Sequence, residues 1–570
     1  MCGITGFVSD IQDKEKIIGS ITDLLHHRGP DDSGYFVDNN VALGHRRLSI
    51  IDLSGGKQPM EDERYVIVFN GEIYNYATLK KDLISKGYSF KTSSDTEVLL
   101  KMFTEYGEKS LELLNGMFAF AIWDKLKEKL FIARDRLGIK PLYYANVNGS
   151  FVFASEVKSI LAFPGFKKEL NEKVISSYFQ YRYILGEETL FKGIKSLLPG
   201  HHLFLENDSP HIEKYWELPV VPSKIHMSEE ECIEKCRSLV IESVKKRMVS
   251  DVPIGAYLSG GLDSSIVAAL MAQFDKDKKL NTFTIGFEEK EFNEFEYARL
   301  VADRYGIDHH EILLNPDDYF ETMDYLIGVK DAPLAVPNEV PLYLMSKYLK
   351  DYITVVLSGE GADELFCGYG RIFISHLDFE KSEEDDYLKF FLDRYNYVSD
   401  SDLDKFLSVE KSDYTQNIFR DYFDKVDVLG IKDKIPYIFQ NLHLQGLLQR
   451  VDNATMAASV EGRVPFVDHE LIEFVSSIPF DQKLRWKDTD AEKFAADNKL
   501  SPAEISETYD IPKYLLRKAF EKDLPREVVE RKKVGFPVPL AKWFGGDFED
   551  YAKKILLDEK TLNRGIFNAD

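Results

Sequence analysis

The sequence predicts an α+β domain followed by an α/β domain that contains a parallel sheet and ends in a helical part. Three observations support this fold class. The chain has 570 residues, which exceeds what one hydrophobic core usually organises, so at least two domains are expected. Short β-rich runs broken by turn residues fill the N-terminal part, whereas strand-like runs that each lead into a helix follow from Ser228. The pattern after Asp378 is almost entirely helical.

In the N-terminal part, turn residues separate the predicted strands. The pair Asn148-Gly149 lies between two strand-like runs, and Asn70-Gly71 carries the same hairpin signature. A helix is predicted over 95–106, with Val98, Leu99 and Met102 on one face. The predicted strands cover 65–75, 117–124, 129–135 and 141–155.

The second part begins after a predicted linker. Residues 206–228 lose periodicity and contain three prolines, so we place the domains at 1–217 and 228–570. A long amphipathic helix is predicted over 229–249. The apolar runs IGAYL, NTFTIGF and ITVVL then alternate with helical patterns, which is typical of a parallel sheet with crossover helices.

Composition excludes several classes of protein. Lys+Arg 72 against Asp+Glu 96 gives a net charge of −24, which argues against nucleic acid or a membrane surface as a partner. Four cysteines in so long a chain do not form a disulfide framework, and the first residues lack the apolar core of a signal peptide. We therefore expect a cytoplasmic protein. The sequence leaves the oligomeric state open, a homodimer included.

Cys2 is a candidate nucleophile. Removal of the initiator Met1 would give Cys2 a free α-amine, and because such amines titrate near about 7.7–8.0, it can act as base for the thiol. A cysteine on an unstructured terminus is the alternative. Asn70 and Gly71 can form an oxyanion hole, Arg47 can bind an α-carboxylate, and Asp95 an α-ammonium. Each has a structural alternative, such as a turn at Asn70-Gly71 or a helix cap at Asp95.

Together and in this order, these motifs resemble the glutaminase domain of N-terminal-nucleophile amidotransferases. The resemblance implies an αββα layered fold in which Cys2 attacks the glutamine side-chain amide and releases ammonia. It also implies a catalytic role for Asn70 and Gly71, and glutamine binding by Arg47, Leu48, Ser49, Ile50, Ile51, Asn70, Gly71, Glu72 and Asp95. The motifs that carry it are MCGITG, HHRGPDDSG (26–34), GHRRLSIID (44–52), FNGEIYN (69–75), SDTEVLL (94–100), MFAFAIWD (117–124), RDRLGIKPLYY (134–144) and FASEVKSI (153–160).

A glycine-rich loop, SGGLDSS (259–265), joins the predicted strand IGAYL to a helix. Its backbone N–H groups and the helix N-terminus favour a bound phosphate, and Ser259, Ser264 and Ser265 add hydroxyl donors. Asp263 would repel a bare phosphate, which suggests a magnesium ion between them. The loop lacks the Gly-Lys-Ser/Thr ending of the mononucleotide P-loop and instead resembles the pyrophosphate loop of ATP pyrophosphatases.

A second loop, LSGEGADELFCG (357–368), follows the apolar run ITVVL. The backbone at Ser358 and Gly359 can run alongside the ribose or adenine. Glu360 faces the reacting acyl group, and Asp363 can complete the magnesium site. The alternative is an acidic helix start, where carboxylates suit the helix dipole.

Both loops, with TFTIGF (282–287), RVDNATMAASVEGRVPFVD (450–468) and RKKVGFPVP (531–539), resemble the synthetase domain of glutamine-dependent asparagine synthetases. The resemblance implies that ATP adenylates aspartate with Mg²⁺ and that ammonia displaces AMP. It implies catalytic roles for Glu360 and Lys533, metal binding by Asp263 and Asp363, and ATP binding by Leu258, Ser259, Gly260, Gly261, Asp263, Ser264, Ser265, Ile285, Ser358 and Gly359.

The chain departs from the family at three places: Gly462, where alanine is usual, the segment VDNATMAAS, and residues 371–432. The identity of the carboxylate that is amidated therefore stays open. Three functions are compatible with the sequence: asparagine synthesis, amidation of another carboxylate such as a uronic acid, and a dead scaffold. The presence of Cys2, Asn70, Asp263 and Glu360 argues against the scaffold, and we take asparagine synthesis as the main hypothesis. Because ammonia must pass between the sites, we expect the face that carries Cys2 to pack on the strand ends at Leu258 and Leu357. We also expect an internal passage between the sites that is lined by apolar side chains and uncharged backbone.

Overall fold

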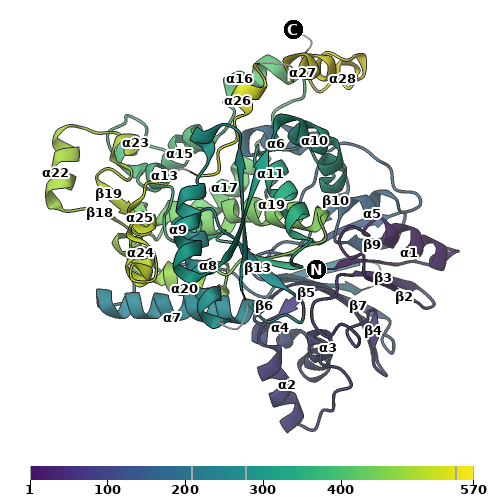
Figure 1. Ribbon diagram of the computed structural model, residues 1–570. Coiled ribbons are helices and arrows are strands. Elements are labelled where there is room, and N and C mark those ends of the chain that lie inside the picture. The colour runs from purple at the N-terminus through teal and green to yellow at the C-terminus, as the bar shows by residue number, and fades with distance from the viewer. Residues whose placement is uncertain (1, 207–208, 276–278, 534, 546–547, 569–570) are drawn as a thin grey trace.

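The computed structural model describes residues 2–568 except 207–208, 276–278, 534 and 546–547. In Figure 1 the N-terminal sheets, in purple and blue, lie at the lower right, and the later parts of the chain form the left and upper sides of the molecule. None of the helices among the described residues is long and apolar enough to cross a membrane.

Two six-stranded antiparallel sheets form the N-terminal part. The strand order is β10-β8-β9-β1-β3-β2 in the first sheet and β12-β11-β7-β6-β5-β4 in the second. The bounds are β1 Gly3–Val8, β2 Asp32–Val37, β3 Val41–Arg47, β4 Met60–Glu61, β5 Tyr65–Ile73, β6 Gly116–Asp124, β7 Lys129–Arg134, β8 Tyr143–Val147, β9 Ser150–Ala154, β10 Ile194–Ser196, β11 His201–Glu206 and β12 Ser209–Lys214.

These two sheets pack face to face between helices, which confirms the αββα layers. Alternation along β5 shows why: Val66 and Val68 face the core between the sheets, whereas Ile67 and Phe69 face the helices. The helices α1 (Lys14–Asp23) and α5 (Val157–Leu161) cover the first sheet, and α2 (Tyr76–Ser85) and α3 (Asp95–Tyr106) cover the second.

Most predicted local elements of this part are present, with two corrections. The helix over 95–106 is α3, and Asn148 and Gly149 form a turn with φ of 52° and 85°. Asn70-Gly71 is not a turn, because it lies inside β5 and pairs with Ala119 and Phe118 of β6. The predicted linker contains β12, and its residues 207–208 lie outside the described residues.

The second part is built on a five-stranded parallel sheet, as predicted, in the order β15-β14-β13-β16-β17. The helix α7 (Glu229–Arg247) precedes it and begins with a capping box at Ser228. Because the strands are parallel, the loops that follow β13 and β16 emerge at the same edge. The bounds are β13 Ile254–Tyr257, β14 Asn281–Phe287, β15 Asp308–Leu314, β16 Val355–Leu357 and β17 Glu461–Arg463.

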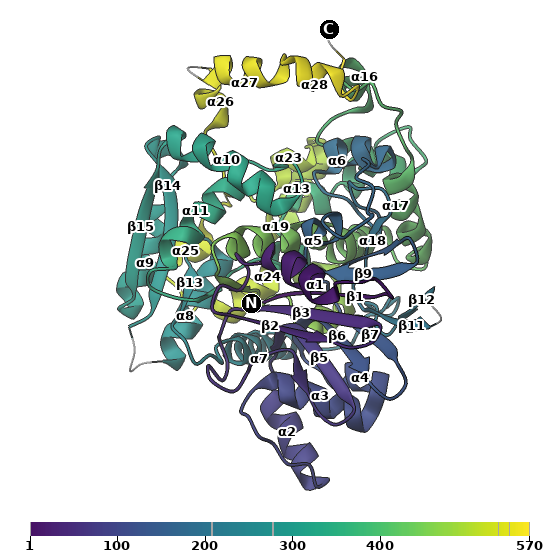
Figure 2. The same ribbon diagram turned by 90° about the vertical axis from the view of Figure 1, so that its right-hand side faces the viewer.

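Helices dominate the C-terminal part. Residues 371–432 fold mainly into short helices, among them α15 (Tyr387–Tyr395), α16 (Asp400–Phe406) and α17 (Tyr414–Lys425). The long helix α19 (Leu444–Ala457) packs on α11 (Glu339–Leu349) and β17. Figure 2 shows α26 (Leu540–Trp543), α27 (Phe548–Leu556) and α28 (Glu559–Asn563) crossing the top of the molecule to α16, where Leu407 pairs with Phe567.

Candidate active sites

The first candidate site surrounds Cys2. This residue directly precedes β1, an inner strand between β3 and β9, and Cys2 is only 8% exposed. The backbone nitrogen of Cys2 donates to Asn70 Oδ1 at 3.1 Å, and its thiol points to the carbonyl oxygen of Leu48 at 4.0 Å. Burial raises the pKa of the thiol. Activation of the thiol therefore needs a proton acceptor, which removal of Met1 would provide as the free α-amine of Cys2.

Asn70 and Gly71 lie beside this nucleophile on β5. Asn70 is fully buried, and its Nδ2 has no hydrogen-bond partner among the described residues. A buried amide without a partner costs about 1–3 kcal/mol, so a ligand that accepts from it would be favoured. A Cβ at position 71 would lie 2.1 Å from the carbonyl oxygen of Met117, so the close pairing of β5 with β6 requires glycine.

Arg47 and Asp95 frame the space next to Cys2. Arg47 ends β3, and its guanidinium donates to the carbonyl oxygens of Asp52 at 2.6 Å and Leu53 at 3.0 Å. It therefore shapes the loop that contains Leu48, Ser49, Ile50 and Ile51, of which Leu48 and Ile50 are buried. Asp95 begins α3 and accepts from the Ile73 backbone nitrogen at 3.0 Å.

The environment of Asp95 is strongly shielded from water. Burial raises the pKa of this carboxyl to about 6, although the N–H of Ile73 favours the charged form. Nearby Glu72 is also buried and lies 3.6 Å from Arg463 of the second part of the chain. An incoming ammonium group would stabilise the Asp95 carboxylate.

The second candidate site is formed by two loops at the carboxyl edge of the parallel sheet. The first loop joins β13 to α8 (Leu262–Phe274). Gly260 has φ +74°, and a Cβ there would lie 2.6 Å from the Ala298 backbone nitrogen. Ser264 Oγ lies 3.1 Å from Ser259 Oγ and accepts from the Ser259 N–H at 3.2 Å, which closes the loop. The resulting ring of donors at a helix N-terminus suits a polyphosphate.

The second loop follows β16 and touches the first. A Cβ on Gly359 would lie 2.8 Å from the Ser264 backbone nitrogen, so only glycine allows this approach. The neighbouring Ser358 is buried, and its N–H donates to the Arg463 carbonyl oxygen at 2.9 Å. Glu360 binds Arg450 Nη2 at 2.7 Å. Leu258 and Ile285 are buried beside the first loop, on neighbouring strands.

Two aspartates meet between these loops around two lysines. Lys513 Nζ lies 2.5 Å from Asp263 and 2.7 Å from Asp363, and Lys533 Nζ lies 2.6 Å from Asp363. Burial disfavours the charge on Asp363, but the two lysines outweigh it and hold the pKa of this carboxyl well below its usual range. Sequence reasoning missed Lys513, because nothing in the spacing of DIPKYLLRK marks it.

The residues present are compatible with a magnesium ion bound together with phosphates. No cluster of three or more His, Cys, Asp or Glu side chains suited to a metal occurs over the described ranges. Mg²⁺ commonly takes only one or two carboxylates from the protein and its other ligands from phosphates and water. Asp263 and Asp363 can supply these two, and Asp263 Oδ1 is buried without a hydrogen-bond partner within the described residues.

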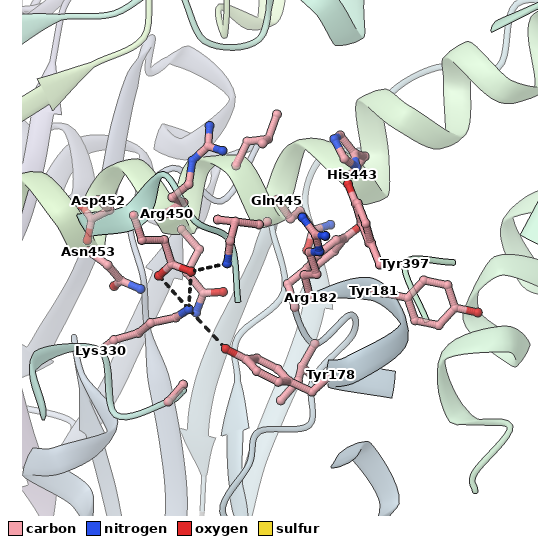
Figure 3. A pocket seen from close by; sticks show the side chains of 18 of the residues that line it. Tyr178, Tyr181, Arg182, Lys330, Tyr397, His443, Gln445, Arg450, Asp452 and Asn453 are labelled. Atoms are coloured by element: carbon pink, nitrogen blue, oxygen red, sulfur yellow. Dashed lines mark hydrogen bonds and ion pairs between the residues drawn. The ribbon is translucent and has the colours of Figure 1, made fainter. Parts of the chain in front are cut away.

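A cavity of about 690 Å³ is lined by residues of both parts of the chain (Figure 3). Lys330 extends into it, binds both carboxylate oxygens of Glu339 at 2.8 and 3.0 Å, and donates to Tyr178 Oη at 3.2 Å. Arg450, the partner of Glu360, also lines it. Sequence reasoning did not single out Lys330, Glu339 or Arg450, although Arg450 begins the RVDNATMAAS motif.

The boundary between the two parts of the chain combines charged and apolar contacts. Near Cys2 it includes the ion pairs Glu72–Arg463 and Arg28–Asp452, which reach β17 and helix α19. Both arginines are fully buried, and the apolar cluster beside them contains Leu48 and Ile50 together with the expected strand-end residues Leu258 and Leu357. Arg28 and Asp452 are paired at 2.9 Å, which lowers the cost of their burial.

Comparison with known proteins yields matches along nearly the whole chain. Residues 1–216 match a glutamine amidotransferase domain model, and residues 235–570 match an asparagine synthase model. Asparagine synthetases (glutamine-hydrolyzing) 1 and 3 of Bacillus subtilis are 35% and 34% identical to the chain, over 98% and 99% of it and 90% and 93% of their own lengths. A glutamine phosphoribosylpyrophosphate amidotransferase structure from B. subtilis is 17% identical, with a TM-score of 0.30 over 55% of this chain and 81% of its own.

Proposed function

This chain belongs to the glutamine-hydrolysing asparagine synthetases, and we propose that its two sites divide the reaction between Cys2 and the loops around Asp263. The enzyme hydrolyses glutamine, uses ATP to activate aspartate as an acyl-adenylate, and transfers ammonia to it to give asparagine. Domain boundaries at 1–217 and 228–570 and a cytoplasmic location belong to this proposal; the four free, buried cysteines agree with a reducing compartment.

At the first site, the Cys2 sulfur attacks the side-chain carbonyl carbon of glutamine, and the α-amine of Cys2 takes the thiol proton. Asn70 Nδ2–H and the Gly71 N–H stabilise the oxyanion. Collapse of the tetrahedral intermediate breaks the carbon–nitrogen bond, the leaving group takes a proton and departs as ammonia, and water then hydrolyses the thioester to glutamate. The contact between the Cys2 nitrogen and Asn70 supports this arrangement.

Glutamine is held by its amino-acid end. Arg47 faces its α-carboxylate and Asp95 its α-ammonium, with the loop Leu48–Ile51 and Glu72 forming the rest of the pocket. The raised pKa of Asp95 supports this role, because a carboxylate poorly stabilised by its surroundings gains most from a cationic ligand.

At the second site, the backbone and hydroxyl groups of Ser259–Ser265 hold the phosphates of ATP, and Leu258, Ile285, Ser358 and Gly359 contact its nucleoside. Asp263 and Asp363 would hold Mg²⁺, which supplies charge neutralisation of the triphosphate when bound. Lys513 and Lys533 stabilise the charge that develops on the departing pyrophosphate. Their ion pairs with the two aspartates support this role.

The cavity that Arg450 lines receives aspartate. Lys330 and Arg450 provide positive charge for its carboxylates, and Glu339 negative charge for its ammonium group. Ammonia attacks the carbonyl carbon of the acyl-adenylate, the carbon–oxygen bond to AMP breaks, and Glu360 takes the proton that nitrogen loses. The similarity to asparagine synthetases of Bacillus subtilis favours aspartate over a uronic acid as the acceptor.

The single observation that carries the assignment is the buried contact of the Cys2 backbone nitrogen with Asn70 at 3.1 Å. We expect Cys2→Ala to abolish glutamine hydrolysis and to leave ATP-dependent asparagine synthesis from ammonium within about twofold, because the thiol serves only the first site. Glutamate release and pyrophosphate release measure the two activities separately. Equal loss of both activities in a folded variant would contradict the assignment of glutamine hydrolysis and synthesis to separate sites.

The reciprocal variant is Asp263→Asn. It should lower pyrophosphate release about a hundredfold, since one ligand of a metal site is lost, while leaving glutamate release close to that of the parent. Normal pyrophosphate release by this variant would remove Asp263 from the site.

A further inference from the structure

Helix α19 forms the contact between the two sites. One stripe of it faces the N-terminal part: Gly446 packs against the Tyr183 ring, Gln449 Nε2 donates to Tyr143 Oη at 3.0 Å, and Asp452 binds Arg28. These positions are three residues apart and therefore share one helix face. Arg450 of the same helix lines the cavity (Figure 3), and its Nη2 donates to Glu360 Oε1 at 2.7 Å.

Asp452 is the charged member of this stripe. It is 3% exposed, its Oδ2 accepts from Arg28 Nη2 at 2.9 Å, and its Oδ1 accepts from Lys140 Nζ at 3.3 Å. Both cations come from the N-terminal part of the chain and are themselves buried. The carboxylate therefore neutralises two charges of the other domain at the wall of the cavity, where little of its surface is exposed (Figure 3).

Arg28 transmits this contact to the nucleophile. Its three donor groups are each engaged: Nη2 with Asp452, Nη1 with Glu156 Oε1 at 2.9 Å, and Nε with the Cys2 carbonyl oxygen at 3.1 Å. Because a guanidinium is planar and rigid, fixing two of its nitrogens fixes the direction of the third. The contact of Arg28 with the synthetase domain thereby fixes the orientation of the Cys2 backbone.

We propose that Asp452 is a positioning residue for the glutaminase reaction, which sets the Cys2 backbone through Arg28. This inference rests on the proposed role of Cys2 as nucleophile. If Asp452 has this role, the glutaminase site is complete only when helix α19 of the synthetase domain is packed against the N-terminal domain. An ion pair that served stability alone would also bury Asp452 with Arg28, so the test must separate the two roles.

The test compares Asp452→Asn with the parent in the full chain. We expect kcat for glutamine hydrolysis to fall about tenfold to a hundredfold, since a misplacement of about 1 Å can cost that much. The KM for glutamine should change less than about threefold, because Arg47 and Asp95 do not contact Asp452. Asp452 also lines the cavity, but its ion pairs are with Arg28 and Lys140, so ammonium-dependent synthesis should fall by a smaller factor than kcat for glutamine hydrolysis.

A matched control is Gln449→Ala, which removes a hydrogen bond from the same face of α19 without touching Arg28. It should leave the kcat for glutamine hydrolysis within about twofold. The double variant Asp452→Asn/Lys140→Met restores the charge balance of the boundary. This double variant should recover the melting temperature of the parent but not its kcat for glutamine hydrolysis. It therefore tests the inference even if the single variant Asp452→Asn folds poorly.

Three outcomes would overturn the inference: a glutaminase kcat within twofold of the parent in Asp452→Asn, an equal loss of both activities, or recovery of kcat in the double variant. Measuring Cys2→Ala in parallel distinguishes a failure of the proposed function from a failure of the proposed role of Asp452. If Cys2→Ala retains glutamine hydrolysis, the proposed function fails; if it abolishes hydrolysis and Asp452→Asn does not reduce it, only the role of Asp452 fails.

Discussion

At the scale of single residues, both sites consist of polar groups held in buried surroundings. Asn70 and Asp95 are at most 5% exposed, and Asp263 and Asp363 are bridged by Lys513. Burial removes competing water and strengthens each interaction with a substrate, but it also shifts the pKa of each carboxyl away from its usual value.

Asp95 gives a prediction about pH. Its pKa is raised to about 6 by burial, so its carboxylate takes up a proton as the pH falls through about 6 and no longer attracts an α-ammonium. We expect kcat/KM for glutamine to decline as the α-amine of Cys2 takes up a proton near about 7.7–8.0, and to decline by a further factor of about ten per pH unit below about 6. Initial rates of glutamate release between pH 5 and pH 8 measure this.

The control for this profile is Asp95→Asn, in which kcat/KM should be low and should not show the decline near pH 6. Ammonium-dependent synthesis by the parent serves as a second reference, because it does not use Asp95. A profile for glutamine that stays flat down to pH 5 would contradict the assignment of Asp95.

At the scale of elements, the second site depends on two strand-to-helix loops that touch. The loop after β13 and the loop after β16 approach each other at Gly359 and Ser264, where there is no room for a Cβ. Adjacent parallel strands deliver both loops to one edge of the sheet, and glycine allows the final approach.

Gly359→Ala tests this contact. The added methyl must push the loops apart by several tenths of an ångström, so we expect ATP-dependent pyrophosphate release to fall at least about tenfold while glutamine hydrolysis is unchanged. The control is Gly328→Ala in α10 (Pro316–Lys330), where a Cβ meets nothing within 4 Å and a helix should tolerate alanine. Unchanged pyrophosphate release in Gly359→Ala would show that the loop contact is not needed.

At the scale of the whole molecule, buried ion pairs join the two parts of the chain. Besides Arg28–Asp452, Lys158 of α5 binds Glu156 and also reaches Asp331 at 3.0 Å across the boundary. These groups are shielded from water, so each carboxylate depends on its cation. The two parts should therefore unfold together.

Lys158→Met is expected to destabilise the protein by about 3–5 kcal/mol, because it leaves Asp331 and Glu156 buried with one cation fewer. Differential scanning calorimetry should show one transition in the parent and the same transition at a lower temperature in the variant. The control is Lys553→Met, which breaks an exposed pair with Glu549 on α27 and should change the melting temperature little. Two separate transitions in the parent would mean that the boundary does not couple the domains.

Residue patterns predicted a sheet-rich N-terminal domain, the parallel sheet and the motifs of both sites, and the resemblance to a known family implied the αββα layers. Helix α3 covers the predicted residues 95–106, and the glycine-rich loop SGGLDSS does join a strand to a helix. These features depend on hydrophobic periodicity, capping and turn residues, which act over a few neighbouring positions and are visible in the sequence. The resemblance to a known family supplied the arrangement of Cys2, Asn70 and Asp95.

Only the tertiary structure decided which distant residues meet. Arg28 and Asp452 are 424 positions apart, and Lys513 is 250 positions from Asp263, so no local pattern announces either pair. The same reason explains Asn70-Gly71, whose turn signature is overridden because β6 pairs along all of β5. A buried charge is stable only where folding brings its partner, and that depends on how whole elements pack rather than on the residues beside it.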